Sequence, residues 1–178
     1  MARQSKKSTG YNPSETNSGV IEEPVSVYQY APQDSITART IGLMGMSGKK
    51  DFTTIKNDND LISLIRAGVP MQAMFHLMKI ADISLKEMSM IVHTSDRTLR
   101  RYTAHQKLSQ EQSERMVEMA RLYSRGIEVF GSIDSFRQWM DTRLLTFGNK
   151  TPKEFLDTSL GIAMLMDEMG KIQHGIFA

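Results

Sequence analysis

The apolar residues between positions 110 and 130 recur with the period of an α-helix. Five of them follow one another at spacings of four, three, four and three residues: Met116, Ala120, Tyr123, Ile127 and Phe130. This spacing places all five on one face of a helix, and Gly131 follows as a typical helix end. No stretch of the chain alternates apolar and polar residues for long enough to predict a β-strand. We therefore predict an all-α fold.

Several short segments carry the residues that begin helices. Ser84 and Ser109 each precede Glu or Gln by three residues, which is the pattern of a capping box. Thr151, Pro152 and Glu154 combine an N-cap, a first-turn proline and an acidic residue, so they predict the start of the last helix. The remaining predicted starts are Asp58 or Asn59, Pro70 and Ser95.

The composition divides the chain into regions. Residues 1–35 are rich in Ser, Thr, Asn, Gln, Pro and Glu, so we expect a disordered or loosely docked tail. Residues 36–57 are mildly apolar and glycine-rich, and we interpret them as a connector. The helical patterns that follow separate after residue 108, which predicts one helical domain over 58–108 and a second over 109–178.

Composition also excludes several classes of function. The 178 residues include no cysteine, which excludes disulfides, thiolate metal sites and a catalytic cysteine. The histidines show no metal-ligand spacing and form no catalytic constellation, so we expect no metal, no cofactor and no enzyme activity. The longest nearly apolar stretch, Leu160 to Met166, is too short to span a membrane. We therefore expect a cytoplasmic protein without a membrane partner.

The segment from Leu85 to Ala104 has the organisation of a helix-turn-helix. Its first half presents an apolar face, and Ser89 is small enough to let a second helix cross closely. Leu99 and Tyr102 would anchor the second helix from the inside. Such a turn usually contains a glycine because one of its residues adopts the left-handed conformation, and His93 stands there in this chain.

Basic charge concentrates on the second helix and just after it. Residues 95–107 contain four basic residues against one acidic residue, although the whole chain has a net charge of only +2. Arginine at the start of a recognition helix can form bidentate contacts to guanine, whereas basic residues further along contact phosphate. The DNA-binding candidates are Thr94, Ser95, Arg97, Thr98, Arg100, Arg101 and Lys107. The alternative interpretation is an ordinary helical hairpin with a solvated arginine face.

The C-terminal region contains an apolar segment that one small chain would have difficulty covering. Leu160 to Met166 has no polar side chain, so a helix over these residues is apolar on nearly every side. We expect a second copy of the chain to cover this helix, which would make the protein a homodimer. The predicted dimer interface consists of Leu160, Ile162, Met164, Leu165 and Met166.

Several short motifs occur in a characteristic order. The C-terminal region contains, in sequence, Phe130-Gly131, Trp139, Thr151-Pro152, Gly161 and Gly175. Upstream of them lie LISLIRAGVP at Leu61–Pro70, LSQEQSER at Leu108–Arg115 and the tripeptide RLY that follows. In these motifs, residues 58–178 resemble the antitoxins of the Xre/MbcA/ParS family, whose partners are RES-domain toxins. The chain departs from the family's pattern at His93, which replaces the usual glycine of the turn.

The resemblance implies a binding protein with two partners and no enzyme activity. The helix-turn-helix would bind the operator DNA of its own gene pair, and region 109–178 would dimerise and block an NAD-consuming RES-domain toxin. We expect the helical core to be complete by Met169, with Gly170 as a break after it. The toxin-binding candidates beyond this break are Lys171, Gln173, His174, Gly175, Ile176, Phe177 and Ala178. The alternative is a stand-alone dimeric helix-turn-helix transcriptional regulator without a toxin partner.

Overall fold

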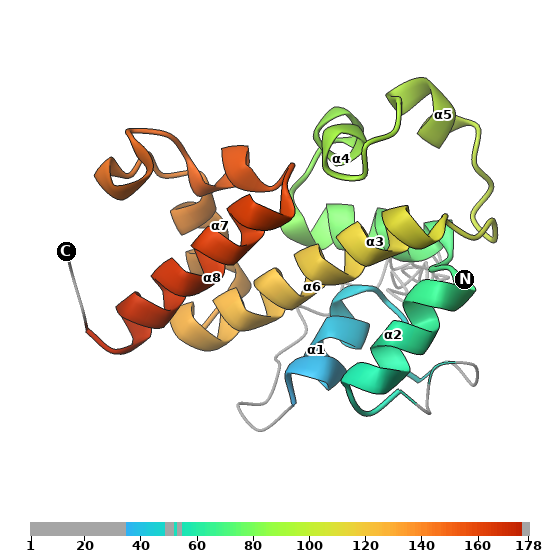
Figure 1. The fold of residues 1–178 in the computed structure, drawn as a ribbon, viewed down its shortest axis with the longest axis horizontal. Coiled ribbons are helices and arrows are strands. Elements are labelled where there is room, and N and C mark those ends of the chain that lie inside the picture. Colours follow the sequence, from blue (N-terminus) through green and yellow to red (C-terminus); the bar gives the residue numbers. More distant parts are fainter. Residues whose placement is uncertain (1–34, 49–51, 53–54, 176–178) are drawn as a thin grey trace, which may run out of the picture.

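The computed structural model describes residues 35–48, 52 and 55–175, and Figure 1 shows these residues as helices joined by loops. No β-strand occurs among them, which confirms the all-α prediction. The predicted tail, residues 1–35, lies outside the described residues except for Ser35. The helices are α1 (Ile36–Leu43), α2 (Asp58–Ala67), α3 (Met71–Ala81), α4 (Leu85–Ile91), α5 (Asp96–Arg100), α6 (Gln110–Phe130), α7 (Ile133–Met140), the 3₁₀ helices η2 (Leu145–Phe147) and η3 (Pro152–Phe155), and α8 (Ser159–Gln173).

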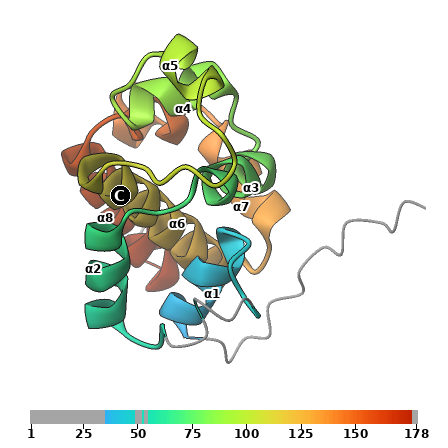
Figure 2. The same ribbon diagram turned by 90° about the vertical axis from the view of Figure 1, so that its right-hand side faces the viewer.

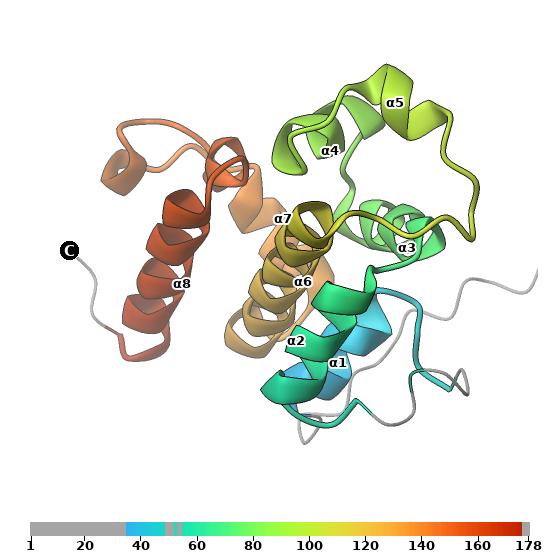
Figure 3. The same ribbon diagram turned by 45° about the vertical axis from the view of Figure 1, so that its right-hand side comes forward.

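Helix α6 forms the centre of the fold. It contacts α1, α2, α3, α7 and α8. Figures 1 and 3 show α1 and α2 on one side of it and α8 on the other. In the predicted apolar stripe, Met116, Ala120, Tyr123 and Ile127 are buried, and Phe130 is half-buried. The stripe is therefore the face on which the core assembles.

The local start and stop signals correspond closely to the observed helix ends. The predicted capping boxes at Ser84 and Ser109 are both present, with each hydroxyl accepting a hydrogen bond from the backbone three residues later. Ser95 caps α5 in the same way, and Gly131 ends α6 with a φ of 78°. Helix α2 begins after Asn57, one residue earlier than predicted, and Asn57 forms a capping box of its own.

The first part of the predicted connector is a helix that belongs to the core. Leu43, Met44 and Met46, at the end of α1 and just after it, are fully buried. The guanidinium of Arg39 is also buried, and it donates a hydrogen bond of 2.9 Å to the backbone oxygen of Ser124 on α6. This helix was not predicted, although Ser35 is its N-cap. Its burial depends on α6, far along the chain.

Helices α6 and α7 approach each other closely at a glycine. A Cβ atom on Gly126 would lie 2.4 Å from the ring of Phe136, so only glycine permits this contact. The same ring meets Tyr123 edge to face, with centroids 5.0 Å apart, and stacks on Trp139 at 5.8 Å. Aromatic pairs of this geometry favour one arrangement of the two helices over sliding alternatives.

The C-terminal helix differs from the prediction at both ends. Thr151 does form a capping box with Glu154, but the helix that follows is the short η3. The long helix α8 begins at Ser159, with Thr158 as its N-cap. Gly170 lies inside α8, which continues to Gln173, so the expected break after Met169 is wrong. A Cβ on Gly161 would lie 2.0 Å from the backbone oxygen of Phe155, and this close contact explains why η3 and α8 need a glycine where they meet.

Candidate functional site

Helices α4 and α5 form the predicted helix-turn-helix. Leu99 on α5 is fully buried, and Tyr102 just after α5 is half-buried, so both anchor the second helix as expected. The most extensive helix contacts of α4 and α5 are with each other. Figures 1 and 2 show this pair at one end of the molecule, opposite α1 and α2. The recognition-type helix is therefore presented at the outer edge of the fold.

Helix α4 begins at a well-satisfied cap. The Glu87 carboxylate accepts hydrogen bonds from both the backbone N–H and the hydroxyl of Ser84, at 2.7 and 2.5 Å. Burial raises the pKa of Glu87, but these hydrogen bonds and the nearby Lys153 ammonium outweigh it and hold the pKa below its ordinary value. Because the folded state lowers this pKa, the stabilisation is present above the unfolded-state pKa and is lost as the pH falls.

The turn between the two helices has the left-handed residue that the motif requires. His93 adopts a φ of +51°, in the position where a glycine is usual. The backbone N–H of Thr94 then donates to the oxygen of Ser89 at 2.9 Å. His93 thus differs from the usual glycine in residue type, but it keeps the left-handed backbone that the turn requires.

Most of the DNA-binding candidates are accessible on this end of the molecule. Those with exposed side chains are Ser95, Arg97, Thr98, Arg100, Arg101 and Lys107. Arg100 lies 3.7 Å from the Asp96 carboxylate one turn earlier. Thr94 is half-buried, and its hydroxyl accepts a hydrogen bond of 2.7 Å from Gln112 on α6. Lys107 lies beyond α5, in a segment bridged antiparallel to Pro70.

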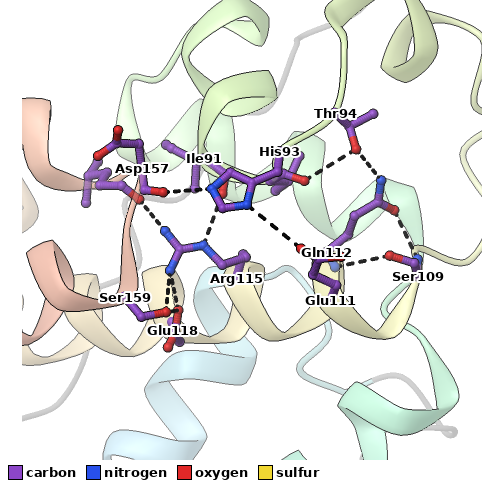
Figure 4. Close-up of polar contacts among 12 residues, drawn as sticks. Ile91, His93, Thr94, Ser109, Glu111, Gln112, Arg115, Glu118, Asp157 and Ser159 are labelled. Atoms are coloured by element: carbon purple, nitrogen blue, oxygen red, sulfur yellow. Dashed lines mark hydrogen bonds and ion pairs between the residues drawn. The ribbon is translucent and has the colours of Figure 1, made fainter.

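A buried arginine connects the helix-turn-helix to the C-terminal half, as Figure 4 shows. Arg115 on α6 is only 5% exposed. Its guanidinium donates to the backbone oxygens of Ile91 at 3.1 Å and Leu156 at 2.7 Å. It also donates to the Ser159 hydroxyl at 2.9 Å and to the Glu118 carboxylate at 2.6 Å. Arg115 was not among the predicted functional residues, because an arginine three residues before a glutamate is typical of an exposed helix pair.

The predicted dimer residues divide between two faces of α8. Ile162 and Leu165 are 6% and 0% exposed, and both pack in the core of the single chain. The expectation that one chain leaves them uncovered is therefore wrong, because α6 lies against that face. Leu160 and Met164, one turn apart, are 74% and 42% exposed. Met166 is half-buried against the core.

The toxin-binding candidates fall at the end of α8. Lys171 and Gln173 lie on the helix itself, and His174 and Gly175 follow it directly. The Gln173 side chain accepts a hydrogen bond from Arg125 on α6, so it has a partner within the chain. The last three candidates, Ile176, Phe177 and Ala178, lie outside the described residues.

Two other kinds of site are absent from the described residues. No group of three or more histidine, aspartate or glutamate side chains in residues 35–48, 52 and 55–175 could hold a metal ion. Within the same residues, no helix has the length and the apolar character needed to cross a membrane.

The fold and the exposed basic helix define the class of helix-turn-helix proteins that carry a second, helical domain. Residues 60–121 match the family described as "Antitoxin Xre-like helix-turn-helix domain". Residues 125–175 match the "Antitoxin Xre/MbcA/ParS C-terminal toxin-binding domain". The chain therefore belongs to the Xre-type antitoxins, a family of regulatory DNA-binding and toxin-binding proteins and not of enzymes. The resemblance noted from the sequence motifs is confirmed.

Two curated relatives support this assignment. The chain is 26% identical over 121 residues to a protein named Antitoxin Xre from Yersinia enterocolitica, and the alignment covers 66% of this chain and 81% of that one. It is 29% identical over 101 residues to an Antitoxin Xre from Photorhabdus laumondii, which covers 56% of this chain and 62% of the relative. The two family matches divide the chain within α6, between residues 121 and 125.

We predict that Arg115→Met destabilises the protein by about 3 kcal/mol, since it leaves two buried backbone oxygens without their donor. The matched control is Arg121→Met on the same helix, whose side chain pairs with Asp58 near the surface. Exposed pairs contribute about 1 kcal/mol or less, so this variant should unfold close to the wild-type midpoint. Urea denaturation followed by circular dichroism measures both. Equal midpoints for the two variants would contradict the role given to Arg115.

Proposed function

We propose that the chain is a cytoplasmic antitoxin that represses its own operon through α5 and neutralises a RES-domain toxin through its C-terminal domain. The observation that carries the proposal is an exposed basic recognition-type helix in the same chain as a domain matched to a toxin-binding family. RES-domain toxins consume NAD, so the antitoxin would protect NAD by covering the toxin's active site. Residues 58–108 would supply the DNA-binding part and residues 109–178 the toxin-binding and dimerisation part.

The DNA-binding part of the proposal depends on which side chains α5 presents. Arg97 lies in the first turn of α5, where residues reach base edges, and Arg100 follows on the exposed side. Ser95 and Thr98 hydrogen-bond to each other at the N-terminus of the same helix. Arg101 and Lys107 lie past the end of α5, in positions suited to phosphate contacts.

We predict that Arg97→Ala combined with Arg100→Ala abolishes specific operator binding and leaves the fold intact, because both side chains are exposed. A lost bidentate contact to a base costs roughly 1–3 kcal/mol of discrimination. The control is Lys56→Ala with Arg66→Ala, which removes the same charge at the two ends of α2. The measurement is a mobility shift of the DNA directly upstream of the chain's own reading frame, against unrelated DNA of equal length.

Two further observations would decide this prediction. Binding by the wild type should fall steeply as salt is raised, because phosphate contacts release counterions. If the Arg97/Arg100 variant shifts the upstream fragment as well as the α2 control does, α4 and α5 are only a helical hairpin with a basic surface.

The toxin-binding part of the proposal rests on the end of the chain. Helix α8 is anchored through Met169, which is fully buried, and through the contact between Gln173 and Arg125. The sequence beyond the helix contains the apolar pair Ile176 and Phe177. An aromatic anchor of this kind suits a concave, partly apolar cleft such as an NAD site.

We predict that deleting Gly175–Ala178 leaves a folded, operator-binding protein that no longer neutralises its toxin, because α8 remains complete to Gln173. Phe177→Ala should weaken neutralisation by roughly 2 kcal/mol or more, as expected for an aromatic hot spot. Gln173→Ala is the comparison variant and should weaken neutralisation less, because its side chain bonds to Arg125 within the chain. Growth rescue and cellular NAD are measured during co-expression with the neighbouring reading frame. Full rescue by the truncated chain would exclude the tail as the blocking element.

The dimer part of the proposal is narrowed to the outer face of α8. Leu160 and Met164 are large, apolar and exposed, and they lie one turn apart in the domain matched to the toxin-binding family. A two-fold axis beside this face would bring the same residues of both copies together. Ile162 and Leu165 would then support the interface from within each chain.

We predict that Met164→Asp gives folded monomers, because a carboxylate would lie in an apolar interface. Leu165→Asp should not fold, since this position is fully buried within one chain. Ile62→Asp on α2 is the matched control: its exposure of 43% is close to the 42% of Met164, and it should remain dimeric. Sedimentation velocity and circular dichroism distinguish the three outcomes. A dimer that survives Met164→Asp would place the interface elsewhere.

A further inference from the structure

The turn of the helix-turn-helix is held by three hydrogen bonds from outside the motif, all visible in Figure 4. Arg115 donates to the oxygen of Ile91 at 3.1 Å, and Gln112 donates to the Thr94 hydroxyl at 2.7 Å. Both of these come from α6. The third contact joins Nε2 of His93 to the backbone oxygen of Asp157 at 2.8 Å. Asp157 belongs to the segment that leads from η3 into α8, in the half of the chain matched to the toxin-binding family.

The partner in the third contact determines which nitrogen of the His93 ring carries a proton. A backbone oxygen can only accept a hydrogen bond, so Nε2 of His93 carries the proton and donates it. Nδ1 of the same ring lies 3.9 Å from the Glu111 carboxylate. Glycine would adopt the φ of +51° at this position without strain. The turn therefore does not need a histidine for its backbone shape. What the side chain adds is the hydrogen bond to Asp157, next to the ion-pair contact with Glu111 on α6.

We propose that His93 is a positioning residue for operator recognition, because it fastens the turn that precedes α5 to the segment before α8. The proposal rests on operator binding by α5. Helix α5 starts just after this turn, at the N-cap Ser95. A small tilt of the turn displaces the start of α5, and base-edge contacts tolerate errors of only about 0.5 Å. The segment before α8 thus contributes, together with α6, to the orientation of the recognition helix.

Two substitutions at position 93 separate the contact from the backbone shape. His93→Gly keeps the left-handed turn and removes the hydrogen bond to Asp157. His93→Gln restores a donor at about the distance of Nε2 from the backbone. Glu111→Gln is the matched control, because it removes only the neighbouring charge. Each variant is titrated as the full-length protein against the DNA upstream of its own reading frame and against unrelated DNA, with urea unfolding in parallel.

The expected result is a loss of affinity without a loss of fold. His93→Gly should unfold near the wild-type midpoint and bind the upstream fragment roughly threefold to tenfold more weakly, the effect of one hydrogen bond. Its binding to unrelated DNA should not change. His93→Gln and Glu111→Gln should bind the upstream fragment as the wild type does.

Three results would overturn the proposal. Wild-type affinity in His93→Gly would show that the turn needs only its backbone shape. Equal weakness in His93→Gln and His93→Gly would show that the hydrogen bond is not what matters. A wild type that binds both DNAs equally would refute operator recognition itself. The wild-type titration alone reveals that failure. The first two results count against the role of His93 only when the wild type prefers the upstream fragment.

Discussion

The buried guanidinium of Arg115 is the interaction on which the rest of the arrangement depends. Its two backbone acceptors are Ile91, the last residue of α4, and Leu156, the C-cap of η3. Carbonyl groups at helix ends lack partners within their own helix and carry partial negative charge. One cation on α6 satisfies both of these helix ends, while Glu118 balances its charge. The position of the helix-turn-helix and the position of the C-terminal domain are therefore set from the same point.

The two matched domains share the continuous helix α6. Residues 60–121 and 125–175 match separate families, yet α6 runs without interruption from Gln110 to Phe130 across the division. Helix α1 packs against α6, and so does α8. The part that carries the exposed helix α5 is thus joined to α8 through the continuous helix α6 and not through a linker.

The C-terminal helix has a buried apolar face and an exposed apolar face. Ile162 and Leu165 face α6 and complete the core, whereas Leu160 and Met164 remain exposed on the other side. Exposed apolar side chains of this size are consistent with a surface that a partner covers. Gly161 allows η3 and α8 to meet closely, and this junction also supplies the Asp157 oxygen that His93 contacts.

The sequence by itself determined the features that depend on near neighbours in the chain. Capping boxes at Ser84 and Ser109 act over three residues, and the helical period of the α6 stripe acts over three or four, so both could be read directly. The left-handed turn at His93 and the exposed arginines of α5 were also predicted from local pattern. The order of the motifs was enough to indicate the family.

Only the tertiary structure decided which residues those local elements meet. Arg115 bonds to groups 24, 41 and 44 residues away, and no local pattern distinguishes it from a solvated arginine. The burial of α1, the delayed start of α8 and the two faces of Leu160–Met166 likewise depend on α6 and η3. Burial is a property of segments that fold against each other, so it cannot be assigned before their arrangement is known.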